Sequence, residues 1–265
     1  MKQRIEAAVC SHCGKVRKNN EDNFYFNGTY MLLDQMDQGA ELNHSSLQPL
    51  QIYAVCDGMG GEEAGEQASY TAVKLMDSLM QKGEKNTSIQ VKINQFANDA
   101  NKAICELKKG AGCTLAMVSI YEGKATVAWL GDSRVYLYRD KKLYRLIQDH
   151  TQTQRLINLG VLDKEAAETH SMRNVLTRYL GMEGENLILQ PSYSEEITLK
   201  KNDLFLLCSD GLTDMVNEEE ISEKLTSEVG LIPKKLVDAA LENGGRDNVT
   251  AMAVKVEAVR RGWLR

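Results

Sequence analysis

The sequence predicts an α+β fold with antiparallel sheets. Three observations support this prediction: strand-like runs joined by short hairpin turns, paired segments with helical periodicity between those runs, and a further strand-like run near the C-terminal end. Hairpins mixed with helix pairs are typical of the α+β class. No linker rich in Pro, Gly or Ser divides the 265 residues, so we predict one domain, residues 1–265.

Helical periodicity predicts two pairs of helices. Apolar residues recur at three- and four-residue spacings over Glu62–Lys82, which Gly83 ends, and again over Ile89–Lys109. The second pair is predicted at Asn217–Ser227 and Pro233–Asn243.

Strand-like runs fill most of the remaining chain, where apolar residues alternate or follow one another without interruption. Glu122-Gly123 and Asp140-Lys141 are predicted as hairpin turns, and Ile197–Ser209 as a strand pair with its turn at Lys200–Asp203. The other predicted strands are Thr114–Tyr121, Lys124–Leu130, Val135–Arg139 and Asn248–Val256.

The segment Thr151–Leu180 interrupts the strand pattern. It begins with polar residues, is helical only in short pieces, and has Gly160 and Gly181 as candidate hinges. We predict a mobile flap that selects substrates; a rigid pair of surface helices is the alternative. A second irregular segment, Leu33–Gln51, has the composition of a loop, and we predict no function for it.

Composition and charge argue against several classes of protein. The net charge of −5 disfavours a nucleic-acid binder, which would normally have a basic face. No run approaches the ~20 apolar residues of a membrane span. The first residues lack the apolar core of a signal peptide, so we expect a cytoplasmic protein, and we expect it to be a monomer.

The six cysteines fit a reduced intracellular protein. Cys10 and Cys13 have the two-residue spacing of a zinc knuckle, but no second Cys or His pair completes four ligands. We therefore interpret the cysteines as structural or incidental.

Four aspartates stand at the ends of strand-like runs. Asp57 follows Ile52–Cys56, Asp132 and Asp210 follow comparable runs, and Asp247 precedes one. A carboxylate beside an apolar strand is costly unless something neutralises its charge. Four of them, three beside a glycine, suggest a shared cation site. Ligands that are all oxygen favour Mg²⁺ or Mn²⁺ over zinc.

Six short motifs then carry a resemblance to a known family. The motifs are Arg17-Lys-Asn-Asn-Glu21-Asp22, Asp57-Gly-Met-Gly-Gly61, Gly112-Cys-Thr114, Gly131-Asp-Ser-Arg134, Ser209-Asp-Gly-Leu-Thr-Asp214 and Gly245-Arg-Asp-Asn-Val-Thr250. In this order they resemble the metal-dependent protein phosphatases (the PPM family, protein phosphatase 2C-like serine/threonine phosphatases) over residues 17–250. The resemblance implies a β-sandwich of two antiparallel sheets, with a helix pair outside each and a small helical flap.

The resemblance also implies metal ligands. Asp57 matches the carboxylate that bridges two Mn²⁺ or Mg²⁺ ions, and Gly58 matches the residue that offers its backbone carbonyl. Asp210 and Asp247 match the other ligands of the first ion.

The remaining matches complete the implied site. Glu21 and Asp22 occupy the acidic pair that holds the second ion directly or through water. Asp132, with Asp210, resembles the third-metal site of bacterial members. Arg17 matches the arginine that binds the substrate phosphate.

Physical chemistry supports the implied reaction. Two divalent ions ~3.5–4 Å apart can hold a bridging water and lower its pKa towards neutrality. The resulting hydroxide would attack phosphorus without a phosphorylated enzyme residue. A guanidinium such as that of Arg17 binds two phosphate oxygens and stays charged. We predict hydrolysis of phosphoserine and phosphothreonine in proteins, with a bacterial Ser/Thr kinase among the partners.

The sequence departs from part of the family in its proton donor. Some members have a His two residues after the bridging Asp, but this chain has Met59, so we expect the proton to come from metal-bound water. His150 is a second candidate acid, although a role at the base of the flap is favoured.

Two other functions stay open: a regulatory scaffold with an inactive site, and a narrow-range phosphatase of a sigma-factor regulator. A cysteine phosphatase is excluded, because only three residues separate Cys13 from Arg17 where five are needed.

Overall fold

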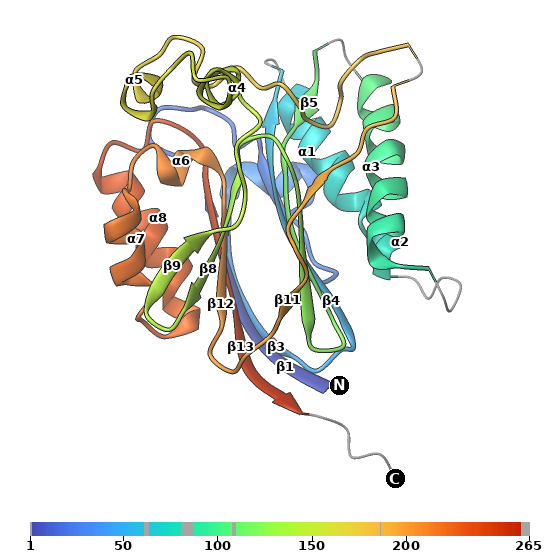
Figure 1. Cartoon of the computed structure of the whole chain (residues 1–265), viewed down its shortest axis with the longest axis vertical. Coiled ribbons are helices and arrows are strands. Elements are labelled where there is room, and N and C mark those ends of the chain that lie inside the picture. Colours follow the sequence, from blue (N-terminus) through green and yellow to red (C-terminus); the bar gives the residue numbers. More distant parts are fainter. Residues whose placement is uncertain (1, 61–63, 81–86, 108–109, 186, 261–265) are drawn as a thin grey trace.

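The structure, a computed structural model, describes residues 2–60, 64–80, 87–107, 110–185 and 187–260. It confirms the predicted class: two antiparallel sheets pack face to face, and helices cover the outer face of each (Figure 1). None of the helices in these ranges has the length and apolar content that crossing a membrane requires.

The first sheet contains both ends of the described chain. Its central strands β1 and β13 pair antiparallel from Lys2 opposite Arg260 to His12 opposite Val249. In spatial order its strands are β3 (Ala40–Ser46), β1 (Lys2–His12), β13 (Val249–Arg260), β12 (Leu204–Cys208), β8 (Arg134–Arg139) and β9 (Lys142–Arg145).

The second sheet is built around β4, whose last residues line the cavity described below. Asp57 in β4 lies directly opposite Asp22 in β2. In spatial order the strands are β10 (Ser192–Tyr193), β7 (Lys124–Leu130), β6 (Leu115–Tyr121), β4 (Leu50–Met59) and β2 (Asp22–Phe26); β11 (Ile197–Thr198) also pairs with β7, and β5 (Gly112–Cys113) with β4.

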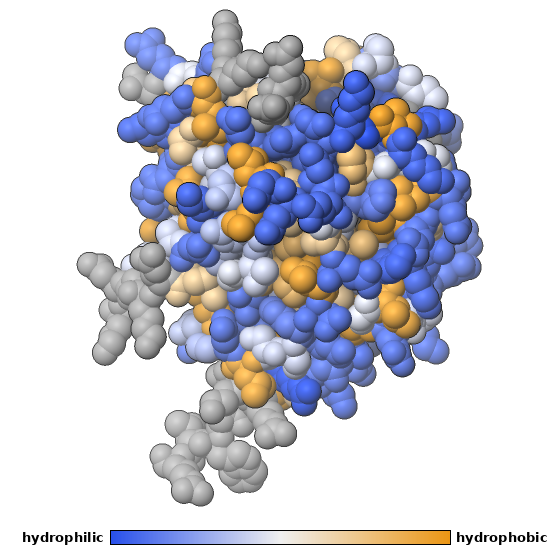
Figure 2. All heavy atoms as spheres, turned by 180° about the vertical axis from the view of Figure 1, so that it is seen from behind, coloured by the Kyte–Doolittle hydropathy of each residue, from blue (hydrophilic) through white to orange (hydrophobic). Residues whose placement is uncertain are grey.

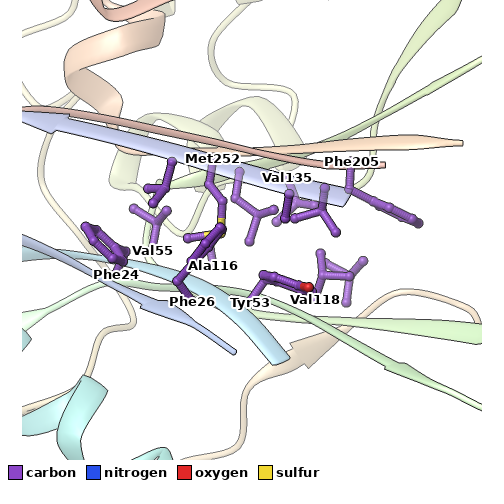
Figure 3. Close-up of a cluster of buried hydrophobic side chains, with 14 of the residues drawn as sticks. Phe24, Phe26, Tyr53, Val55, Ala116, Val118, Val135, Phe205 and Met252 are labelled. Atoms are coloured by element: carbon purple, nitrogen blue, oxygen red, sulfur yellow. The ribbon is translucent and has the colours of Figure 1, made fainter. Parts of the chain in front are cut away.

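The main core lies between the two sheets (Figure 3). Phe24 and Tyr53 of the second sheet face Phe205 and Met252 of the first, and all four side chains are fully buried. Strand alternation gives β12 two apolar faces: Phe205 points into this core, whereas Leu206 points towards the helices. Apolar residues on both faces explain why β12 has a continuous apolar sequence.

Helices cover each sheet, as the sequence predicts. Ser88 and Asn217 begin α3 and α7 by accepting hydrogen bonds from Val91 and Glu220. On the second sheet lie α1 (Ala64–Leu75), α2 (Asp77–Met80) and α3 (Ile89–Cys105); on the first lie α6 (Asp210–Thr213), α7 (Glu218–Lys224) and α8 (Ile232–Glu242). Short 3₁₀ helices occupy Leu33–Gln38 and Val229–Leu231.

Two of the predicted helices differ from the observed ones. The predicted helix Glu62–Lys82 is two helices, interrupted at Met76, and its outermost residues lie outside the described ranges. The helix predicted to reach Lys109 ends at Cys105.

The predicted strand pair Ile197–Ser209 is wrong. β11 pairs with β7 in the second sheet, whereas β12 pairs with β8 and β13 in the first. The turn between them therefore crosses the sandwich. Asp203, 1% exposed, fixes it by accepting hydrogen bonds from the Lys200 backbone (2.6 Å) and from Arg139 (2.7 and 2.6 Å). Apolar alternation cannot reveal this choice of partner.

The segment Leu33–Gln51, predicted as a loop, contains ordered structure. Residues 40–46 form the edge strand β3, which pairs with β1 from Ser46 opposite Ile5 to Ala40 opposite Ser11. An edge strand has one neighbour only, and the side chains of β3 are alternately half-buried and exposed. It therefore needs few apolar residues, and its polar sequence resembles that of a loop.

The segment Thr151–Leu180 holds two short helices, α4 (Gln152–Asn158) and α5 (Lys164–Glu168). Between residues 152 and 175, Thr153 and Ala167 are the only buried residues among those described. An ion pair of 3.1 Å between Arg173 and Asp214 links the segment to α6. Few buried apolar contacts favour local opening, so the mobile flap stays a prediction.

Amide exchange tests this mobility. We expect amides of residues 152–173 to exchange at least about tenfold faster than those of β12, because little apolar surface holds the flap closed. Hydrogen–deuterium exchange followed by mass spectrometry measures both segments in one sample. Equal protection of the two segments would show a rigid surface helix pair instead.

Candidate active site

One cavity of about 510 Å³ lies where the ends of the two sheets meet beneath the flap. Asn174 and Leu176 of the flap form part of its wall. The structure brings seven of the eight predicted site residues to this cavity: Arg17, Glu21, Asp57, Gly58, Asp132, Asp210 and Asp247.

Asp57 is held by its backbone at the end of β4. Its N–H donates to the Thr114 hydroxyl and its carbonyl accepts from the Thr114 N–H, both at 2.9 Å. Thr114 is fixed in turn by the Ser133 hydroxyl at 2.6 Å. Burial raises the pKa of Asp57 well above its usual value, and the charges of Asp22 and Asp210 raise it further.

Asp22, the eighth predicted residue, lies behind the cavity wall rather than on it. Its side chain is fully buried and accepts hydrogen bonds from the hydroxyls of Ser209 and Thr250, both at 2.7 Å. The second carboxylate oxygen, Oδ1, is buried without a hydrogen-bond partner among the described residues. Burial raises the pKa of Asp22 to about 7.

Gly58 is required by close backbone contact. A side chain there would place its Cβ 2.2 Å from the Gly65 carbonyl oxygen and 2.6 Å from that of Glu21. The Gly58 N–H donates to the same Glu21 carbonyl at 3.1 Å. The absence of a side chain therefore brings Glu21, Gly58 and the start of α1 together at the cavity.

Asp210 and Asp132 also line the cavity. Burial raises the pKa of Asp210 to about 6, and the charge of Asp247 contributes. Burial and the charge of Asp210 raise the pKa of Asp132 well above its usual value. Arg134 partly offsets both shifts, because its positive charge lies close to the two carboxylates.

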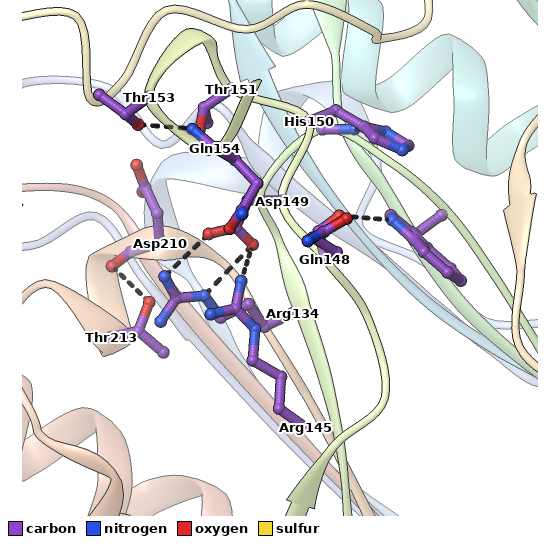
Figure 4. A network of polar contacts seen from close by, with 12 residues as sticks. Arg134, Arg145, Gln148, Asp149, His150, Thr151, Thr153, Gln154, Asp210 and Thr213 are labelled. Carbon is purple, nitrogen blue, oxygen red and sulfur yellow. Dashed lines mark hydrogen bonds and ion pairs between the residues drawn. The ribbon is translucent and has the colours of Figure 1, made fainter. Parts of the chain in front are cut away.

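Arg134 belongs to a cluster that the sequence does not reveal (Figure 4). Asp149 accepts hydrogen bonds from Arg134 at 2.9 and 3.4 Å and forms an ion pair with Arg145 on its other side. Asp149 thereby fixes the Arg134 guanidinium beside the acidic wall. The motif Gly131–Arg134 contains the arginine, but nothing in the sequence connects it to Asp149.

Arg17 lies at the mouth of the cavity. Its guanidinium donates to Asp247 at 2.7 Å, and about half of the side chain is exposed. The Asn248 side chain holds the loop that carries Arg17. It donates hydrogen bonds to the carbonyls of Cys13 (2.9 Å) and Asn19 (2.8 Å) and accepts one from the Glu21 N–H (2.9 Å). Sequence reasoning assigned no role to Asn248, although it directly follows Asp247.

His150 braces the base of the flap. Its Nδ1 accepts from the Gly131 N–H at 3.2 Å, its Nε2 lies 3.0 Å from the Ser192 hydroxyl, and its ring stacks on Trp129. Burial and the charge of Arg178 lower the pKa of His150 to about 4. His150 does not line the cavity, which favours the role at the flap base over that of a general acid.

The donors around the cavity fit a hydrated divalent cation. All the candidate ligand atoms are oxygens, the carboxylates repel one another, and Asp22 Oδ1 is buried without a hydrogen-bond partner in the described part of the chain. Within the described ranges, no three His, Cys, Asp or Glu side chains converge closely enough to hold one ion unaided. Mg²⁺ commonly retains several waters and binds only one or two carboxylates, so this spacing agrees with its chemistry.

The crowding of carboxylates predicts a gain in stability when one is neutralised. In chelator at pH 8, we expect Asp57→Asn to melt above the wild type, by about 2–4 °C for each kcal/mol of relieved repulsion. Because the pKa of Asp57 is raised in the folded protein, the folded wild type takes up a proton and gains stability as the pH falls. The difference in melting temperature between variant and wild type should therefore be smaller at pH 5. Thermal melts at both pH values test this, with exposed Glu242→Gln as control. A variant that melts lower at both would show that Asp57 stabilises the metal-free fold.

Comparisons with known proteins identify the family of this chain. Residues 37–241 match the family described as Protein phosphatase 2C. Serine/threonine phosphatase stp of Listeria monocytogenes is 31% identical over 264 residues, covering 94% of this chain and 95% of that protein. Protein phosphatase PhpP of Streptococcus pneumoniae is 31% identical over 271 residues, covering 95% and 98%.

Solved structures show the same fold. The crystal structure of the Mycobacterium tuberculosis serine/threonine phosphatase PstP/Ppp has a TM-score of 0.79 at 31% identity, and the match covers 96% of this chain and 100% of that one. The catalytic domain of PstP in complex with two manganese ions has a TM-score of 0.77 at 29% identity, with the same coverage. With its acidic cavity and its motif order, the chain therefore belongs to the protein phosphatase 2C (PPM) family.

Proposed function

We propose that this chain is a metal-dependent phosphatase that hydrolyses phosphoserine and phosphothreonine in proteins. The observation that carries the proposal is one cavity with carboxylates from several strand ends and Arg17 at its mouth. The relatives named as serine/threonine phosphatases, and the manganese in one of their structures, support it. Phosphorylated proteins, including a Ser/Thr kinase, are its proposed partners.

Two ions, Mn²⁺ or Mg²⁺, are the proposed cofactors. Asp57 would contact both; Gly58, through its carbonyl, and the pair Asp210 and Asp247 would supply further oxygens. When bound, such ions neutralise phosphate charge and activate water for attack on phosphorus.

The remaining acidic residues have distinct proposed roles. Glu21 lines the cavity and would contact the second ion. Asp22 is buried behind the cavity wall and would help to hold the same ion, directly or through water. Asp132 lines the same cavity and, with Asp210, would hold a third ion beneath the flap. The flap residues Asn174 and Leu176 would contact the substrate.

The chain's own residues bind and orient the phosphorylated side chain. Arg17 stands at the mouth, where a planar guanidinium can donate to two phosphate oxygens. Met59 lines the cavity but has no proton to give, so the leaving hydroxyl takes its proton from water. An inactive scaffold is disfavoured, because every proposed ligand position keeps its oxygen donor.

Metal removal gives the first test. We expect activity on p-nitrophenyl phosphate and on a phosphothreonine peptide to disappear in EDTA and to return with Mn²⁺ or Mg²⁺, because the cavity's carboxylates need cations to admit a phosphate dianion. Asp57→Ala should stay inactive with metal present. Full activity of metal-stripped protein would contradict the proposal.

Arg17→Ala gives the second test. A group that binds the phosphate in both the ground state and the transition state contributes uniform binding, so its loss should raise KM about tenfold with a smaller fall in kcat. Steady-state kinetics with the phosphothreonine peptide measures both constants. The KM of Arg17→Lys should lie between those of the wild type and Arg17→Ala. An unchanged KM would remove Arg17 from the site.

A further inference from the structure

Three exposed cationic residues, Lys15, Lys18 and Arg246, flank the paired residues Arg17 and Asp247 on two loops beside the cavity. We propose that these residues, here called the basic rim, bind acidic side chains that flank the phosphorylated residue, so that the enzyme prefers acidic phosphopeptides. This inference rests on the proposed function, because it concerns the same site.

The two loops form one rigid support. The Lys15 N–H donates to the Gly245 carbonyl at 2.7 Å. At Gly14, an added Cβ would lie 2.3 Å from the Asp247 carbonyl oxygen, so the two backbones are in direct contact. The Asn248 side chain bonds both ends of the 13–19 segment. The cations of the basic rim are therefore carried on a backbone that is already ordered.

The rim cations are available for a ligand. Lys15, Lys18 and Arg246 are exposed, and within the described ranges their charged groups have no ion pair or hydrogen bond. By contrast, the nearby Arg17 is paired with Asp247 and Arg173 with Asp214. The Lys15 stem passes close to Gly245, with Cγ 3.3 Å from the position of a Cβ there, which places it next to Arg246.

The position of the rim suits residues near the phosphate. Lys18 lines the cavity itself, and an extended peptide advances about 3.3–3.6 Å per residue. With its phosphate in the cavity, a peptide therefore has its flanking residues beside Lys18 and beside the joined loops that carry Lys15 and Arg246. Unpaired cations there attract carboxylates and repel lysine or arginine. Exposed pairs are individually weak, so each should change kcat/KM only about two- to fivefold, and less at high salt.

Two phosphothreonine peptides test the proposal with the full chain in Mn²⁺. They differ only in having two Glu or two Ala on each side of the phosphothreonine. We expect the wild type to prefer the acidic peptide by about tenfold in kcat/KM at low salt. Lys15→Ala/Arg246→Ala, which leaves Lys18 in place, should reduce this ratio to about twofold, and Lys15→Glu/Arg246→Glu should invert it.

A matched control removes the same charge at the other end of the sandwich. Lys141→Ala/Lys201→Ala alters two exposed lysines on turns remote from the cavity and should keep the wild-type ratio. All variants should retain wild-type activity on p-nitrophenyl phosphate, which has no flanking residues and so reports an intact catalytic site.

The outcomes separate the two proposals. A wild type without preference, or a Lys15→Ala/Arg246→Ala variant with the wild-type ratio, overturns the basic rim while p-nitrophenyl phosphate hydrolysis continues. An equal loss of ratio in the remote control would assign the effect to net charge and also overturn it. A wild type inactive on every substrate with metal present would instead overturn the proposed function.

Discussion

The crowding of negative charge where the two sheets meet is the constraint on which the rest of the site depends. Asp57 lies near the end of β4, Asp210 begins α6 and Asp247 precedes β13, so three elements bring carboxylates to one cavity. Burial and mutual repulsion disfavour the charged forms of Asp57 and Asp210. Such an arrangement is stable only near positive charge, which explains why Arg17 and Arg134 border it and why divalent cations suit it.

The same region joins the two sheets through polar bonds. Asp22 belongs to the second sheet, whereas its partners Ser209 and Thr250 lie at the ends of strands in the first. Ser209 and Thr250 also bond each other, through the Ser209 hydroxyl and the Thr250 N–H at 3.0 Å. Elsewhere the sheets meet through apolar side chains, as around Phe205. The acidic site is therefore built into the contact that sets the spacing of the sheets at this end.

Local patterns in the sequence predict most helices and strands of this structure. The main error concerns which strands pair with one another. The hairpin turn predicted at Asp140-Lys141 is correct, and both residues have a left-handed φ there. Such a turn can be predicted because its geometry depends on neighbouring residues only. Asp203 could not reveal that its turn crosses the sandwich, since Arg139 is distant in sequence. In the site, the aspartate motifs predicted that four carboxylates lie together, and all four line the cavity. The burial of Asp22 and the hold of Asp149 on Arg134 depend on packing that no single motif encodes.

Asn248 connects the acidic cavity to its basic rim. Its backbone follows Asp247, while its side chain holds the loop that carries Lys15 and Lys18 and also bonds the Glu21 N–H. A small shift of Asp247 on metal binding would therefore be transmitted to the rim cations through one amide side chain. The residues proposed to hold metal and those proposed to bind the peptide share this support, so the position of the phosphate and that of its flanking residues are set together. If the basic rim and the flap act as proposed, selectivity in this site would follow from rigid loops beside the cavity as well as from the flap above it.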